Sequence, residues 1–177
     1  MKKHLTLPLG EQEVRALKIG DNVLISGVLY TGRDSVHKYL LSSPADCPVN
    51  LRDMAIYHCG PIVVKKDGEW SVTAAGPTTS SRTEPYVADI IKNFGVRAFI
   101  GKGGLGDRTL SACREYGCVY LSAVGGCAQV LAKSILNVKN VYFYEEFGPP
   151  EAIWELEVKD FPAIVTMDSH GSTMHNV

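Results

Sequence analysis

The fold is decided by two glycine-containing stretches, Gly76-Pro77-Thr78-Thr79-Ser80-Ser81-Arg82 and Gly101-Lys102-Gly103-Gly104-Leu105-Gly106. Each follows a short apolar run that is typical of a strand and precedes a run with helical spacing. In such a strand-loop-helix unit, free backbone N–H groups and the positive end of the helix dipole face the ligand. Arg82 and Lys102 add positive charge, and the first stretch adds hydroxyl donors. We therefore expect the two loops to hold a dicarboxylate or a phosphate.

Downstream of the first loop, helices and strands alternate. Apolar residues recur at helical spacing from Tyr86 to Phe94, and Gly95 is expected to end that helix as a left-handed cap. The elements predicted next are strand 96–100, helix 107–116, strand 119–122, a glycine turn at 125–126, helix 127–136, strand 138–144 and strand 163–167. This succession predicts a parallel sheet with right-handed crossovers.

Upstream of the first loop, short strands predominate. They are predicted at 5–9, 23–30, 54–58, 62–66 and 70–75, with a polar helical turn or loop at 11–17 and a helix at 35–41. Asp67-Gly68 indicates a tight hairpin, because both residues tolerate a positive φ. The pattern as a whole indicates an α/β fold in one domain that spans residues 1–177.

Composition excludes several classes of function. The chain has 177 residues, 45% of them hydrophobic, and a net charge of −1, so it can build a core but has no basic stripe for nucleic acid. No segment approaches the roughly 20 apolar residues that a membrane span needs, and the first residues lack the apolar stretch of a signal peptide. We expect a cytoplasmic protein that binds neither nucleic acid nor membrane.

The cysteines and the terminal histidines carry no motif. The five cysteines form neither a Cys-x-x-Cys pair nor a Cys/His set at zinc spacing, so we expect reduced thiols and no metal site made by this chain alone. His4 and His175 lie near the ends of the chain and are expected to be solvated.

The second glycine stretch also matches a dinucleotide fingerprint, Gly101-x-Gly103-x-x-Gly106, between a strand and a helix. A complete fingerprint has an acidic residue about 20 positions later that holds the ribose. Here the next strand ends in Ser122-Ala123-Val124 instead. A non-catalytic anion- or nucleotide-binding module stays as the alternative of another functional class.

Six dispersed motifs, taken together, resemble a known family. They are Thr31-Gly32-Arg33-Asp34-x-x-His37, Gly60-Pro61, Gly76-Pro77-Thr78-Thr79-x-x-Arg82, Gly101-Lys102-Gly103-Gly104, Ala152-Ile153-Trp154 and Asp168-Ser169-His170-Gly171. In this order they are similar to the beta subunit of the iron-sulfur hydro-lyases, the class I fumarate hydratases and L-tartrate dehydratases. The resemblance covers nearly the whole chain. The Arg-Asp motif and the segment 151–161 look more like fumarate hydratase.

The resemblance implies a swivelling three-layer β/β/α domain with a mostly parallel central sheet and a smaller antiparallel sheet. It also implies reversible hydration of fumarate to malate, with L-tartrate or another hydroxy-diacid as the alternative substrate. In this family a [4Fe-4S] cluster acts as Lewis acid on the departing hydroxyl. The cluster cysteines belong to an alpha subunit, so this chain resembles half of a hetero-oligomer, which could be a dimer of heterodimers.

The site residues that the resemblance implies are mostly cationic. Arg33, Arg82 and Lys102 are expected to bind the two substrate carboxylates, with Thr78 and Thr79 close to the reacting carbon. Arginine offers a planar fork for a carboxylate, whereas lysine offers a point charge. Without the resemblance, the two threonines could be helix caps and the cations could be ordinary solvated charges.

The proton-transfer group has several candidates. The resemblance indicates Thr78, whose hydroxyl would need nearby positive charge, from Lys102 or the cluster, to lose its proton. Asp34 and His37 have more suitable intrinsic pKa values. Asp34 could instead cap the following helix or orient Arg33, and His37 is expected to support the site from behind. Asp168 and His170 are supporting residues that could fix the C-terminal turn or contact the partner.

Overall fold

A computed structural model describes residues 2–124 and 126–176 of the chain. In this part of the chain the main sheet has seven strands, which are β1 (Lys3–Thr6), β2 (Asn22–Thr31), β3 (Ala55–Tyr57), β6 (Ala98–Gly101), β7 (Val119–Ser122), β8 (Ile135–Tyr142) and β9 (Ile153–Met167). The helices are α1 (Glu11–Arg15), α2 (Asp34–Ser42), α3 (Glu84–Phe94), α4 (Asp107–Tyr116), α5 (Ala128–Ala132) and α6 (Tyr144–Phe147), with 3-10 turns η1 (Pro44–Asp46) and η2 (Ser80–Thr83). Gly125 of the expected glycine turn lies outside the described residues.

The main sheet closes on itself. Strands β1, β2, β3, β6 and β7 are parallel neighbours in that order, whereas β9 runs antiparallel to both β7 and β2. The pairings β2-β3-β6-β7-β9-β2 therefore form a ring, to which β1 adds beside β2 and β8 adds beside β9. The expected mixed α/β fold with a mostly parallel central sheet is confirmed.

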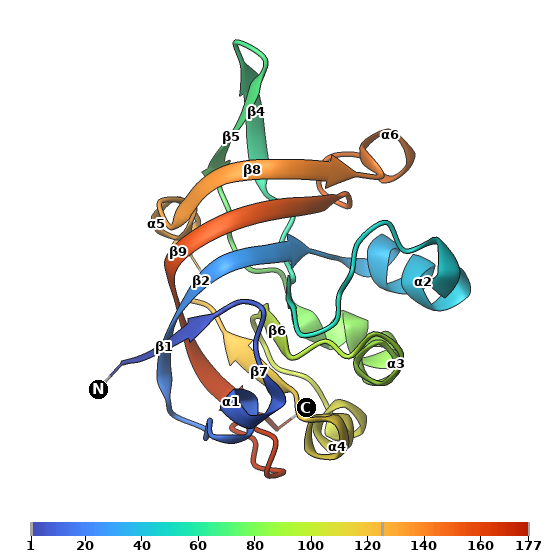
Figure 1. Ribbon diagram of the computed structural model, residues 1–177, viewed down its shortest axis with the longest axis vertical. Helices are drawn as coiled ribbons and strands as arrows, with labels where there is room; N and C mark the ends of the chain where they lie inside the picture. The colour runs from blue at the N-terminus through green and yellow to red at the C-terminus, as the bar shows by residue number, and fades with distance from the viewer. Residues whose placement is uncertain (1, 125, 177) are drawn as a thin grey trace.

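Side chains alternate between two cores. On β6, Ala98 and Ile100 belong to the core enclosed by the sheet, and Phe99 belongs to the core under the helices. Helices α2, α3 and α4 lie side by side on this outer face (Figure 1). Both faces of the central strands are buried, which explains why these strands are short continuous apolar runs instead of alternating ones.

The predicted hairpin is confirmed as a separate two-stranded sheet. Strands β4 (Ile62–Lys66) and β5 (Glu69–Ala74) pair around Asp67-Gly68, and Asp67 has a φ of 53°. The ribbon extends beyond β8 at the top of the view (Figure 1). Trp70, which pairs with Lys65 close to the turn, attaches the ribbon to the core, because its ring lies 5.3 Å from that of buried Trp154 in an edge-to-face arrangement.

Two predictions in the last third of the chain are wrong. The helix expected at 127–136 ends at Ala132, and Ile135 already pairs with Val158 in β8. The last strand is not confined to 163–167 but begins at Ile153. The sequence hides the longer strand because exposed Lys159 and Asp160 interrupt its apolar pattern. As a result the chain ends in an antiparallel β8-β9 pair, not in a further parallel step.

Other expected features agree with the structure. Gly95 ends α3 with a φ of 68°, in the left-handed conformation predicted for it. The polar segment at 11–17 contains the short helix α1. Within the described residues, no helix has both the length and the apolar character required to cross a bilayer.

Gly27 should be intolerant of substitution. It lies at a register shift between β2 and β9, its φ is 110°, and an added Cβ would come within 2.7 Å of the Leu7 carbonyl oxygen. We expect Gly27→Ala to lower the free energy of unfolding by about 2 to 4 kcal/mol, because steric overlap adds to the strain of a positive φ. The measurement is urea unfolding followed by circular dichroism.

Gly68→Ala is the matched control for this substitution. Gly68 also has a positive φ, 87°, but no atom lies within 4 Å of an added Cβ. Gly68→Ala should lower the free energy of unfolding only by the strain of a positive φ, about 1 to 2 kcal/mol. Equal losses in the two variants would contradict the close approach at Gly27.

Candidate functional site

Most residues of the predicted site lie at one edge of the sheet. Because β2, β3 and β6 are parallel neighbours, their carboxyl ends meet at the same edge. Arg33 follows β2, His58 follows β3 and Lys102 follows β6. The usual ligand position in an open α/β sheet is this edge. The structure therefore brings together loops that are far apart in the sequence.

Thr78 is held between two of these loops. Its backbone N–H and its Oγ1 both donate to the carbonyl oxygen of His58, at 2.7 and 3.1 Å. The carbonyl oxygen of Thr78 accepts from the N–H of Lys102 at 3.3 Å, and Thr79 forms an isolated bridge with Lys102. Neither threonine makes a side-chain cap at the start of η2 or α3. The capping alternative for Thr78 and Thr79 is therefore wrong.

Arg33 is paired with Glu151, which the sequence analysis did not identify. The Nε of Arg33 lies 3.2 Å from Oε1 of Glu151, and Oε2 of the same carboxylate accepts from the N–H of Ser35 at 2.9 Å. Glu151 thus caps α2 and holds Arg33. The Arg33 Nε is nevertheless poorly aimed, because it has no hydrogen bond of acceptable geometry among the described residues.

Asp34 is paired with Arg82, not with Arg33. The Oδ2 of Asp34 lies 3.3 Å from the Nε of Arg82, and both side chains are about half exposed. Asp34 is the first residue of α2 and makes no side-chain cap. Asp34 therefore neither caps the following helix nor orients Arg33, and both of these alternatives are wrong. Its other oxygen, Oδ1, is buried without a hydrogen-bond partner in the described part of the chain.

The expectation of cations without matching acids holds only in part. Arg33 and Arg82 each have a carboxylate partner from a distant segment. Lys102 is exposed, and the ion pairs within the described ranges do not include it. Pairing with an acid fixes an arginine in one geometry and leaves its outward N–H groups available.

The start of α4 is already occupied by a carboxylate of the chain itself. Glu84 accepts from the N–H of Gly106 at 2.8 Å, and from the N–H and hydroxyl of Thr109 at 3.2 and 2.7 Å. The expectation that this helix end is open to a bound anion is therefore wrong. A pyrophosphate would have to displace Glu84, which argues against the nucleotide-binding alternative.

Two fingerprint glycines are explained by close packing. A Cβ on Gly101 would overlap the Oγ of Ser80, and a Cβ on Gly106 would lie 3.0 Å from Glu84. Each glycine therefore makes room for a side chain of the same protein. Packing within the protein therefore accounts for these two glycines without a bound dinucleotide.

His37 is buried beneath the edge and not exposed to a substrate. Its side chain is inaccessible to solvent, as is that of Ser80, and the ring contacts His58 through Nε2 atoms 3.1 Å apart. Burial lowers the pKa of His37 to about 4, and Asp34 and Glu151 only partly oppose this effect. His37 is thus neutral at pH 7, which agrees with a supporting position and argues against a role as proton donor.

Asp168 and His170 lie at the opposite edge. β9 runs antiparallel to β7, so its carboxyl end lies beside the start of β7. The buried Asp168 carboxylate accepts from the backbone N–H groups of Ile19, His170 and Ser172 at 3.0 to 3.1 Å. Their placement as supporting residues of the site is wrong, and fixing the C-terminal turn is what Asp168 does.

The last described residues return toward the glycine loop. His175 was expected to be solvated, but its ring is partly buried. Its ring is close to Gly104 and packs edge to face on Tyr120 with centroids 5.6 Å apart, while Nε2 contacts Oγ1 of Thr166 at 2.8 Å. Sequence reasoning had no signal for this placement. Glu151 and Glu84 were missed for the same reason, since an acidic side chain is usually solvated.

The cysteines do not fit an iron-sulfur cluster. Cys59 follows β3 at the site edge, whereas Cys113 and Cys118 lie at the end of α4 near the opposite edge. Residues 2–124 and 126–176 contain no group of three or more His, Cys, Asp or Glu side chains arranged to hold a metal ion. A [4Fe-4S] cluster needs three or four converging thiolates, and the described residues do not bring three cysteines together.

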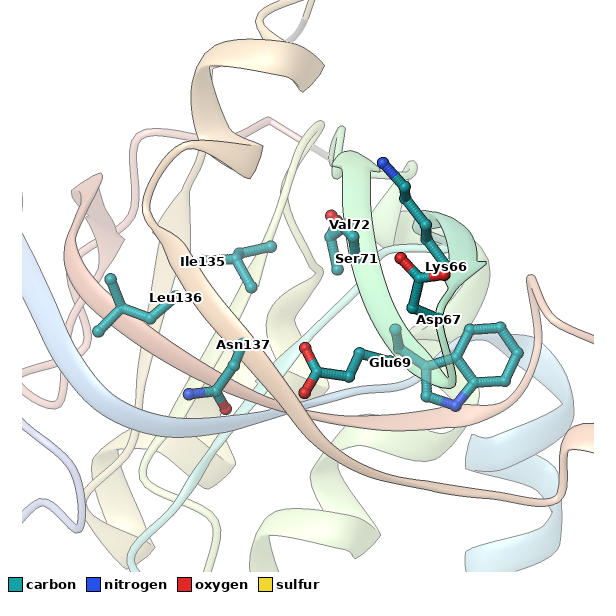
Figure 2. Close-up of a pocket in the computed structure, with 9 residues that line it drawn as sticks. Lys66, Asp67, Glu69, Ser71, Val72, Ile135, Leu136 and Asn137 are labelled. Carbon is teal, nitrogen blue, oxygen red and sulfur yellow. The ribbon is translucent and has the colours of Figure 1, made fainter.

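A pocket of about 430 Å³ lies away from this edge. It is formed between β5 and β8, with Ile135 opposite Val72 (Figure 2). None of the predicted site residues lines it. The cations are therefore not arranged around this pocket.

Comparison with known proteins agrees with the family resemblance. The family model described as Fumarase C-terminus matches residues 2–177. A Geobacillus stearothermophilus protein provisionally named fumarate hydratase class I is 55% identical over 97% of this chain, which spans only 33% of that protein. The beta subunit of L(+)-tartrate dehydratase from Escherichia coli K12 is 35% identical over 98% of this chain and 87% of its own length.

A third relative, from Methanocaldococcus jannaschii, is provisionally named L(+)-tartrate dehydratase subunit beta. It is 44% identical over 94% of this chain and 88% of its own length. Together with the match of the family model, these relatives show that the chain belongs to the Fumarase C-terminus family, whose named members are class I fumarate hydratases and L(+)-tartrate dehydratase beta subunits.

Proposed function

We propose that this chain is the beta-type half of a two-part iron-sulfur hydro-lyase that catalyses the reversible hydration of fumarate to malate. The observation that carries the proposal is the edge at which Thr78 is fixed between His58 and Lys102, beside Arg33. The higher identity to the fumarate hydratase relative supports fumarate over tartrate. L-Tartrate or another hydroxy-diacid is the alternative substrate.

Arg33, Arg82 and Lys102 are proposed to bind the substrate carboxylates. A dicarboxylate carries two negative charges, and these cations offer two planar forks and one point charge. Glu151 and Asp34 hold the two arginines in place before substrate arrives. Thr79, exposed beside Lys102, adds a neutral donor to the same surface.

Thr78 is proposed as the group that exchanges a proton with the substrate carbon. In the dehydration direction its deprotonated Oγ1 takes the C–H proton while the C–O bond on the neighbouring carbon breaks and hydroxide leaves. The positive charge of Lys102 would stabilise the alkoxide. Asp34 remains the second candidate, because its buried Oδ1 has no hydrogen bond to the described residues.

The iron-sulfur cluster is proposed to belong to an alpha subunit, because two relatives are named as beta subunits, which implies a partner. An exposed apolar surface supports a docking face for it. Ile62 and Val64 on β4 are 61% and 47% exposed, and Leu136 on β8 is 57% exposed. The complete assembly is proposed to be a hetero-oligomer, in the form of a dimer of heterodimers, located in the cytoplasm.

We further propose that residues 1–177 act as one domain of the swivelling β/β/α type. The helices α2 to α4, the main sheet and the β4-β5 ribbon support three layers in that order (Figure 1).

The proposed function is tested by reconstitution. The chain is purified without oxygen and combined with an alpha-type partner, such as the remaining part of the Geobacillus relative, and with iron and sulfide. We expect malate dehydration and fumarate hydration only in the combined sample, because this chain provides no cluster ligands. Stoichiometric iron binding or turnover by the isolated chain would contradict the proposal.

Removal of the Lys102 charge should impair catalysis. Lys102→Ala leaves a substrate carboxylate or a developing oxyanion without its partner, a loss of about 2 to 4 kcal/mol of transition-state stabilisation. We expect kcat/KM for malate to fall by roughly two to three orders of magnitude. Lys92→Ala, which removes the same charge from the far end of α3, is the control. Near-normal activity of Lys102→Ala would exclude Lys102 from the site.

Removal of the Thr78 hydroxyl should stop proton exchange. Thr78→Val keeps the shape of the side chain, so substrate binding should persist while turnover and exchange of the malate C–H proton with solvent disappear. The exchange is measured by NMR in deuterated water. Thr73→Val, which removes an exposed hydroxyl on β5 outside the site, is the control and should retain exchange. If Thr78→Val retains exchange and Asp34→Asn loses it, the base is Asp34.

A further inference from the structure

A continuous chain of hydrogen bonds runs through the interior beneath the site edge. The Tyr120 hydroxyl donates to Oγ of Ser80 at 2.8 Å, and Ser80 Oγ lies 2.7 Å from Nδ1 of His58. His58 Nε2 lies 3.1 Å from His37 Nε2, and His37 Nδ1 lies 2.7 Å from the carbonyl oxygen of Arg33. All four side chains are at most 1% exposed.

One pattern of protons satisfies every member of this chain. The Arg33 carbonyl can only accept, so His37 Nδ1 carries a proton and its Nε2, if the ring is neutral, must accept. His58 must then donate from Nε2 and accept at Nδ1, where the Ser80 hydroxyl donates. Ser80 Oγ in turn accepts from Tyr120. With both rings neutral, the two imidazoles therefore have opposite tautomers, His37 protonated at Nδ1 and His58 at Nε2.

The surroundings of the two rings favour neutrality. Phe99 packs against both, with ring centroids 6.1 and 5.5 Å away. Burial lowers the pKa of His37 to about 4, against the smaller opposing effects of the Arg33 carbonyl and of the Asp34 and Glu151 carboxylates. Burial and then the neighbouring His37 lower the pKa of His58 well below its usual value.

The chain connects the loops that carry the proposed site. The backbone carbonyl of His58 accepts both hydrogen bonds of Thr78, and the N–H of Ser80 donates to the carbonyl of Lys102 at 2.9 Å. The opposite end of the chain is the backbone of Arg33. A displacement of His58 that includes its backbone would therefore move Thr78 relative to Arg33 and Lys102.

We propose that His58 is a positioning residue, whose neutral ring, fixed between His37 and Ser80, sets the placement of the Thr78 hydroxyl relative to Arg33 and Lys102. This inference rests on the proposed roles of Thr78 and the two cations. The chain is not a proton relay, because Thr78 Oγ1 donates to the His58 carbonyl and not to its ring.

The first test needs no activity. ¹⁵N NMR of the histidine rings in the intact chain should show His37 protonated at Nδ1 and His58 protonated at Nε2, with both rings neutral from about pH 8 to pH 5. A cationic ring at pH 6, or the reverse tautomers, would overturn the proposal. Because this measurement uses the unsubstituted chain, it tests the tautomers of His37 and His58 even if a variant fails to fold.

The second test compares two buried hydroxyls in the assembled enzyme. Ser80 and Thr109 are both fully buried, and each makes a hydrogen bond of 2.7 Å, but only Ser80 belongs to the chain. Ser80→Ala should lower kcat, and malate C–H exchange in parallel, on the order of ten- to a hundredfold. Thr109→Val should lose similar thermal stability with less than about a twofold change in kcat.

Equal effects of Ser80→Ala and Thr109→Val on kcat would reduce Ser80 and His58 to structural residues and overturn the positioning role. Failure of the proposed function is a distinct result. In that case the combined sample would neither dehydrate malate nor hydrate fumarate, while the tautomers of His37 and His58 would still be those given above.

Discussion

The antiparallel pairing of β9 with β2 is the constraint on which the rest of the structure depends. It converts a row of parallel strands into a ring and encloses one of the two cores. Thr31 fixes the register where β2 ends and β9 begins, since its hydroxyl donates to the Ala152 carbonyl and accepts from the N–H of Trp154. This register places Glu151, just before β9, next to Arg33. The electrostatics of the site edge thus follow from sheet closure.

Much of the fold could be predicted, because the central strands and helices have local signals. Apolar runs, helical periodicity, the Asp67-Gly68 turn and the cap at Gly95 all depend on neighbours in sequence. The long β9 and the short α5 could not be predicted in this way. Ile135 becomes a strand residue only through its partner Val158. The exposed pair Lys159-Asp160, at the register shift of β9 against β2, resembles a loop when its neighbours in β2 are unknown.

The candidate site shows the same division. The glycine loops indicated Thr78 and Lys102, and the family resemblance added Arg33, but neither could pair the charges. Glu84 and Glu151 act as helix caps across distant segments, and nothing near them in sequence indicates this. The motif Ala152-Ile153-Trp154 also has a structural cause, because it begins β9 and its tryptophan is buried in the core.

The placement of the two chain ends has a practical consequence for protein engineering. Lys3 pairs with Val23 at the amino edge of the sheet, so a fusion partner joined before β1 would start on the side opposite the site. At the other end, His175 packs beside Gly104. An affinity tag attached there would begin next to the glycine loop, on the surface proposed to bind substrate. Purification handles and covalent linkers therefore belong at the N-terminus.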